Sequence, residues 1–162
     1  MATSDPVTIL LAHDAWATRE IIGVCIGLND EQFHRRFEMG PGSLHDTVTH
    51  TIAAMRVWTD ILAQREVRPR IEGTKRTLAE LEQLHAEAAA ELAAVAKRHP
   101  LDEVVVRVRE GKSYPSTRGA VITHVTTHGM HHRAQCLNML RHLGVNPLPM
   151  SSVIEWARSV DV

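Results

Sequence analysis

The sequence has few of the residues that mark several common protein classes. Aromatic side chains make up only 4% of the 162 residues, and the cysteines are two, Cys25 and Cys136. Two cysteines are too few for a disulfide scaffold and fit a reducing compartment better than a secreted one. No apolar run approaches the roughly 18–20 residues that cross a bilayer. We therefore expect a cytoplasmic protein that has no membrane partner.

The chain also has no marked excess of positive or negative charge. The 18 Lys and Arg residues nearly balance the 19 Asp and Glu residues, so the formal net charge is −1. This balance provides no basic footprint for nucleic acid and no polybasic membrane anchor. The first residues lack a basic start followed by an apolar run, so we expect no signal peptide. With 44% hydrophobic residues, the composition is that of an ordinary globular protein.

Length and patterning predict one all-α domain that spans residues 1–162, a four-helix bundle. Four long segments carry apolar residues at helical spacing and begin at residues typical of helix N-termini. They run from Pro6 to about Leu28, from Ser43 to a point before Pro69, from Thr77 to a point before Pro100, and from about Thr117 to Leu143. A short helix over 152–160 is expected to cover one end.

The segment before the fourth helix has a different period. Val104, Val106 and Val108 alternate with polar or charged residues, and Glu110-Gly111 is a turn signal. We expect a short β-hairpin there. We expect residues 29–42 to form a connection, and two connections are long enough to cross an end of the bundle.

Histidine is the residue type in excess, with 11 in the chain. His128 and His132 lie one helical turn apart on the apolar face of the fourth helix, the spacing by which helices present two ligands to a metal. His50 faces inward from the second helix and could complete a three-histidine site. The alternative is that these are core histidines with hydrogen-bond partners. The remaining histidines that we place on flanks or at the surface are His34, His85, His99, His124, His131 and His142.

Three neutral imidazoles leave an ion its full charge and an open coordination position. Such an ion can activate water or deprotonate a bound thiol. Imidazole ligation suits zinc, nickel, iron or copper, so the ligand set does not choose among them; we expect zinc or nickel, with iron as an alternative. Gly129 follows His128, where peptidases of the H-E-x-x-H type carry their glutamate, so we do not expect a peptidase of that kind.

Several other residues have more than one interpretation. Asp14 points inward and either orients a ligand or acts on substrate as a catalytic group, or is a structural ion pair. His131 is either an acid/base group or a flank residue. Cys136 is either a fourth ligand or core filler. Trp58 either packs in the core or lines the pocket.

At these residues the sequence resembles the DinB/YfiT-like family of bacterial metalloproteins. The resemblance rests on Leu10–Arg19, on the segment Gly42–His50, and above all on His124–Gln135 with its H-x-x-x-H-R pattern. It covers most of the chain and implies a four-helix bundle with a divalent metal held by His50, His128 and His132. The family often has an aromatic residue where this chain has His13.

The resemblance also implies a function, because characterised relatives include thiol-dependent transferases and an isomerase. Our leading hypothesis is a metal-dependent thiol (S-)transferase in stress or detoxification. The alternatives are a metal-dependent hydrolase, a non-catalytic metal-binding stress protein, and a metal-free bundle with a histidine-lined pocket. The expected partners are a small-molecule substrate, a low-molecular-weight thiol and a second copy of the chain in a homodimer.

Overall fold

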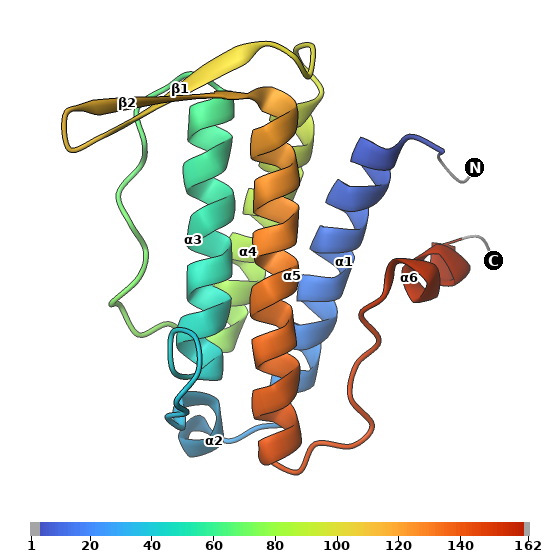
Figure 1. Cartoon of the computed structure of the whole chain (residues 1–162). Helices are drawn as coiled ribbons and strands as arrows, with labels where there is room; N and C mark the ends of the chain where they lie inside the picture. The colour runs from blue at the N-terminus through green and yellow to red at the C-terminus, as the bar shows by residue number, and fades with distance from the viewer. Residues whose placement is uncertain (1–3, 161–162) are drawn as a thin grey trace.

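Four long helices dominate the computed structural model, which describes residues 4–160 (Figure 1). They are α1 (Pro6–Cys25), α3 (Leu44–Leu62), α4 (Leu78–Ala96) and α5 (Arg118–His142). Two short helices, α2 (Asp30–His34) and α6 (Val153–Val160), and a hairpin of β1 (Val104–Arg109) and β2 (Lys112–Thr117) complete the described part. The predicted four-helix bundle with a hairpin before the last long helix is confirmed.

Each long helix begins at the residue type that the sequence indicates. The side chains of Asp5, Ser43, Thr77 and Thr117 each accept a hydrogen bond from a backbone N–H in the first turn. These bonds satisfy donors that have no partner inside the helix. At Thr77 the bond is reciprocal, because Glu80 accepts from the Thr77 N–H.

The bundle does not alternate direction from one helix to the next. α1 and α5 run one way, while α3 and α4 run the other (Figure 1). Around the bundle, α1 packs against α4 and α5, and α3 packs against the same two helices. Because α3 and α4 are consecutive and parallel, the connection over residues 63–77 must return along the length of the bundle.

Arg118 ties together the ends of the two parallel helices. Its side chain is completely buried, and its Nη1 and Nη2 donate to the carbonyl oxygens of Leu62 (2.7 Å) and Val95 (2.9 Å). These carbonyls lie in the last turns of α3 and α4, where the helix leaves acceptors without partners. One guanidinium at the start of α5 therefore caps two neighbouring helices.

The hairpin extends sideways from the same end of the bundle (Figure 1). Its strands pair antiparallel in a register that sets Arg107 opposite Tyr114 and Arg109 opposite Lys112. Glu110 and Gly111 adopt positive φ angles of 53° and 73°, as a two-residue hairpin turn requires. Only Val105 of β1 is buried, so the hairpin rests on the bundle through a small apolar contact.

One helix boundary differs from the sequence prediction, and one connection contains a helix that was not predicted. α1 ends at Cys25 rather than Leu28, and the connection that follows contains α2, which Asn29 and Gln32 stabilise by a reciprocal capping box. α3 ends at Leu62, well before Pro69, because the buried carboxylate of Asp60 accepts bonds from Arg65 and from the backbone of Arg68. These bonds fold the chain back toward the helix.

The core of the bundle consists of aliphatic side chains from all four long helices, among them Ile21, Ile52, Leu81 and Met139. A smaller cluster joins Trp16 of α1 to Trp156 of α6. None of the helices between residues 4 and 160 is long and apolar enough to cross a membrane.

Candidate metal centre

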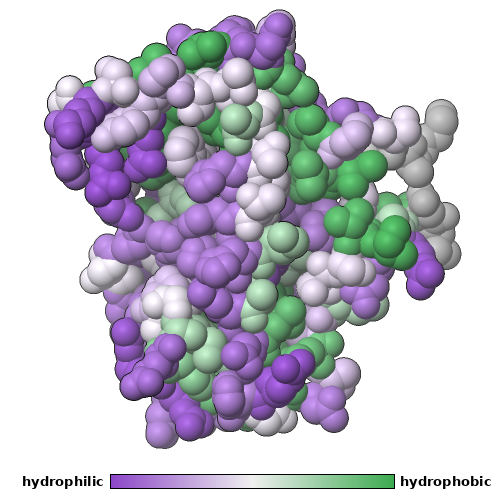
Figure 2. Space-filling view, in the orientation of Figure 1, coloured by the Kyte–Doolittle hydropathy of each residue, from purple (hydrophilic) through white to green (hydrophobic). Residues whose placement is uncertain are grey.

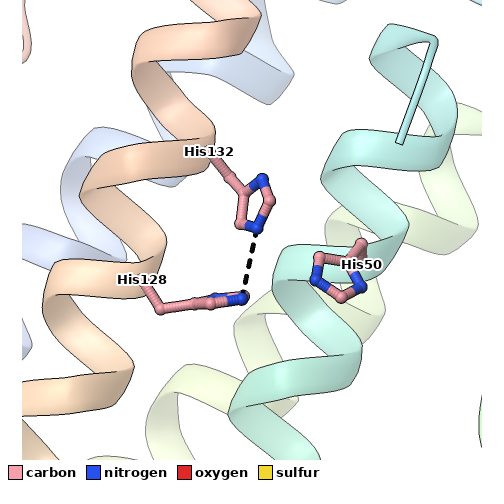
Figure 3. Close-up of side chains that lie close together, drawn as sticks. All are labelled: His50, His128 and His132. Carbon is pink, nitrogen blue, oxygen red and sulfur yellow. Dashed lines mark hydrogen bonds between the residues drawn. The ribbon is translucent and has the colours of Figure 1, made fainter. Parts of the chain in front are cut away.

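Three histidines from two helices meet on one side of the bundle. His50 lies on α3, while His128 and His132 lie one turn apart on α5 (Figure 3). One nitrogen of each ring lies within 4.8 Å of the corresponding nitrogen of the other two. The ring centroids are 5.1 Å apart for His50 and His128 and 4.8 Å apart for His50 and His132. The structure therefore brings together the three residues that the sequence singled out.

Two of the three rings are held by oxygen atoms on their far side. Nδ1 of His132 lies 2.8 Å from Oε1 of Gln135, and Nδ1 of His50 forms a longer contact of 3.4 Å with Oε1 of Glu72. An N–H at Nδ1 that donates to such an oxygen leaves Nε2 with a free lone pair. This is how metal-binding histidines are usually oriented.

The donor set fits a divalent transition metal. The Nε2 atoms of His128 and His132 are 3.2 Å apart, shown by the dashed line in Figure 3. Two imidazoles on one tetrahedral ion, each about 2.0–2.1 Å from it, would have nitrogens about 3.3 Å apart. An ion would therefore satisfy both lone pairs with little movement of either ring.

The surroundings keep the rings of His128 and His132 neutral. Burial, followed by the proximity of His132 and His50, lowers the pKa of His128 to about 4. Burial also lowers the pKa of His132, against the opposing effect of its bond to Gln135. A neutral imidazole is the form that binds a metal, so both residues are competent ligands at neutral pH.

The centre is open on one side. The His132 side chain is buried, whereas His50 and His128 are half-buried. Hydrophilic residues gather over the middle of the face that α3 and α5 form (Figure 2). A hollow of about 210 Å³ adjoins the centre and is lined by His50, Glu72 and Thr49 among others. A small molecule can therefore approach the three nitrogens from solvent.

Asp14 lies behind the centre rather than in it. Its carboxylate forms a buried ion pair with Arg133, and Arg133 also donates to Thr18. Burial raises the pKa of the Asp14 carboxyl, which the contact with Arg133 opposes. Gly129 makes room for this pair, because a Cβ there would collide with Asp14. The pair therefore locks α1 against the turn of α5 that carries His128 and His132.

His131 is exposed, and its ring centroid lies 5.1 Å from that of His132. Gln135 links the two rings, since its Nε2 lies 3.1 Å from Nε2 of His131 while its Oε1 contacts His132. Gly40 approaches the same amide so closely that a Cβ would collide with it. His131 thus lies at the rim of the centre, where an acid/base group would have access to solvent.

Three further residues from the sequence analysis, Cys136, His85 and His13, lie in other parts of the fold. Cys136 is buried in the aliphatic core, and burial raises the pKa of its thiol. The prediction that His85 lies on a flank or at the surface is wrong, because the ring is buried between α4 and α1. His13 is buried too, but its Nε2 bonds the carbonyl of Ser151 (2.8 Å) and so fastens the segment before α6.

Sequence reasoning missed the two residues that orient the ligands. Glu72 lies on the crossover between α3 and α4, where no periodic pattern exists, so the sequence carries no signal for it. Gln135 carries such a signal, because it lies three residues after His132, one helical turn away on the same side.

Fold and site together define a class: a four-helix bundle with a three-histidine centre between two of its long helices. The family model of the DinB family matches residues 1–158, so the chain belongs to the DinB family. Among solved structures, the chain is similar to the DinB-like protein YjoA from Bacillus subtilis, with a TM-score of 0.68 and 15% identity over 91% of this chain and 99% of that one. No curated protein matches it. The family and the histidine group together support a metal-binding protein of the DinB type.

Proposed function

We propose that this protein is a metal-dependent enzyme that transfers a low-molecular-weight thiol to an electrophile, as in detoxification or a stress response. The observation that carries the proposal is the half-open arrangement of three imidazoles, two of them held at Nδ1 by Gln135 and Glu72. This arrangement supplies ligands on one side and leaves the other side for a substrate.

His50, His128 and His132 would hold the ion, which we expect to be zinc or nickel, with iron as the alternative. A bound divalent ion supplies a Lewis acid that lowers the pKa of a coordinated thiol or water. In the proposed transfer, the thiol loses its proton and its sulfur forms a bond to the electrophilic carbon. The leaving group departs with the electron pair of its own bond.

The chain contributes groups at the rim and behind the centre. We propose that His131 accepts the thiol proton at a ring nitrogen, since it is exposed and lies beside His132. We propose a positioning role for Asp14, whose ion pair with Arg133 fixes the turn of α5 that carries two ligands. Neither role requires a further carboxylate in the centre.

Two measurements test this function. Elemental analysis of untagged protein is expected to find about one transition-metal equivalent, lost in His50→Ala, His128→Ala and His132→Ala and retained in His99→Ala, a variant at an exposed position. Conjugation of a low-molecular-weight thiol with a chromogenic aryl halide should then require the metal. No metal after zinc or nickel is added would overturn the proposal.

The same preparations separate the competing hypotheses. A metal-dependent hydrolase would release products from ester or amide substrates without any thiol. A non-catalytic metal-binding stress protein would hold the ion and accelerate neither reaction. A metal-free bundle with a histidine-lined pocket would show the same thermal stability before and after chelation.

We also propose a cytoplasmic homodimer. Its support is an apolar strip on β1, where Val104, Val106 and Val108 are 50–67% exposed. Contiguous exposed apolar surface of this kind is typical of protein contacts. Light scattering coupled to size exclusion distinguishes a dimer from a monomer, and a Val106→Lys variant should shift the equilibrium toward the monomer.

A further inference from the structure

A second hollow lies next to the metal centre, between the hairpin and the bundle. Its volume is about 350 Å³, within the range of small-molecule sites. Ile61, Val105 and Val121 give it an apolar floor, and Trp58 and Arg107 stand at its side. The hollow therefore combines apolar surface with a cation, which suits one end of an amphipathic molecule.

Ring contacts connect this hollow to the metal centre. The ring of Trp58 lies 4.9 Å from that of His124, and His124 lies 5.7 Å from His128, centroid to centroid. Trp58 is two turns beyond His50 on α3, and His124 is one turn before His128 on α5. The hollow and the three histidines therefore occupy neighbouring stretches of one surface, with the His124 ring between Trp58 and His128.

Arg107 is the cation without an acidic partner in this hollow. Its guanidinium lies 5.0 Å above the ring of Trp58, and no carboxylate pairs with it among residues 4–160. The acid that also lines the hollow, Glu110, is engaged by Arg109 at 3.2 Å. A planar guanidinium positioned by an indole is well suited to bind a carboxylate with two parallel hydrogen bonds.

We propose that the thiol substrate carries a carboxylate at the end of an apolar segment, and that Arg107 binds this carboxylate while the sulfur lies at the three histidines. This inference rests on the proposed thiol-transfer function and specifies its substrate class. The apolar floor contacts the segment between the two ends. Arg107 is then a specificity-determining residue that contacts substrate away from the reacting atoms.

Two probes of equal length test the proposal. ω-Mercaptooctanoate and ω-mercaptooctanol have the same chain length, and only the first is an anion. Binding to cobalt-loaded protein is followed by the thiolate-to-cobalt charge-transfer absorption, without turnover. The wild type should bind the acid at least ten-fold more tightly than the alcohol.

Two variants locate the effect. Arg107→Gln should bring the two affinities together by weakening the acid alone. Lys112→Gln removes the same charge from the same hairpin outside the hollow, and it should keep the wild-type preference. Loss of the preference in both variants would show a general charge effect and overturn the inference.

The remaining outcomes separate this inference from the function beneath it. Equal binding of both thiols by the wild type, or a preference that survives in Arg107→Gln, overturns the carboxylate site and leaves thiol binding standing. Absence of the charge-transfer band with either thiol, on protein shown to hold cobalt, overturns the thiol-transfer function and this inference with it.

Discussion

Gln135 Oε1 lies 2.8 Å from Nδ1 of His132, so a neutral amide orients the most deeply buried ligand of the centre. Gln135→Leu should therefore weaken metal binding by about 10–100-fold, the usual cost of losing such a partner. Competition with a chromogenic chelator measures this change.

Asn138→Leu is the matched control for that variant, because Asn138 is an exposed amide on α5 whose side chain contacts Met39. It should bind metal as the wild type does. Equal affinity in both variants would show that Gln135 does not orient His132.

His85 should make the protein less stable in mild acid. Burial, followed by the positive charges of Arg19 and Arg133, lowers its pKa from 6.5 to about 4 in the folded chain. Between these values the unfolded chain takes up a proton that the folded chain cannot. The free energy of unfolding therefore falls as the pH drops from about 6.5 to about 4, by about 3 kcal/mol in total.

His85→Leu removes this contribution, so its urea-unfolding free energy should decrease less over the same pH range. His142→Gln, at an exposed position, should follow the wild type. The comparison isolates His85 because all other histidines are common to the wild type and the Leu variant. Parallel pH profiles of the wild type and His85→Leu would contradict the assignment.

The pair between Asp14 and Arg133 should behave as a buried ion pair. Asp14→Ala or Arg133→Ala leaves one charge buried without its partner, and each should cost about 3–5 kcal/mol of unfolding free energy. The double variant should cost clearly less than the two single changes combined. Urea denaturation gives all four values.

Metal stoichiometry provides a separate readout for this pair. Neither side chain forms a hydrogen bond or ion pair with His50, His128 or His132 in the part of the chain that the structure describes, so each folded variant should still bind one equivalent. Loss of the metal from folded Asp14→Ala, with Arg133→Ala still loaded, would contradict a role of Asp14 through the ion pair.

Arg118 should be a strong determinant of stability, although it lies far from the metal centre. Arg118→Met removes the donors to Leu62 and Val95 and leaves the Leu62 carbonyl without its partner, at about 1–3 kcal/mol, while Val95 keeps its bond from the Arg98 N–H. Thermal and urea unfolding measure the loss. Arg109→Met, on the exposed hairpin, should change stability by less than about 0.5 kcal/mol.

Much of the fold could be predicted because its helix starts are local. Asp5, Ser43, Thr77 and Thr117 act on N–H groups within three residues of themselves, so the sequence alone carries the information. The helix ends depend on longer contacts. α3 stops where Asp60 binds Arg65 and Arg68, which no periodic pattern could reveal.

In the metal centre, too, the features set by local sequence could be predicted and those set by long-range contacts could not. His128 and His132 are one turn apart, so helical geometry alone predicts that they share a face. His85 was misplaced because α4 is rich in alanine, and small residues on several faces of a helix do not distinguish its buried side. Glu72 could not be predicted, since it reaches His50 only after the crossover has returned along the bundle.

The crossover between the parallel helices has a thermodynamic consequence. His50 precedes that crossover while His128 and His132 follow the hairpin, so one ion would link segments that are separated by about half of the chain. Such a link closes a long loop of the chain reversibly. Closing the same loop in the unfolded chain costs conformational entropy. By mass action, the melting temperature would then rise with free metal concentration and serve as a gauge of occupancy.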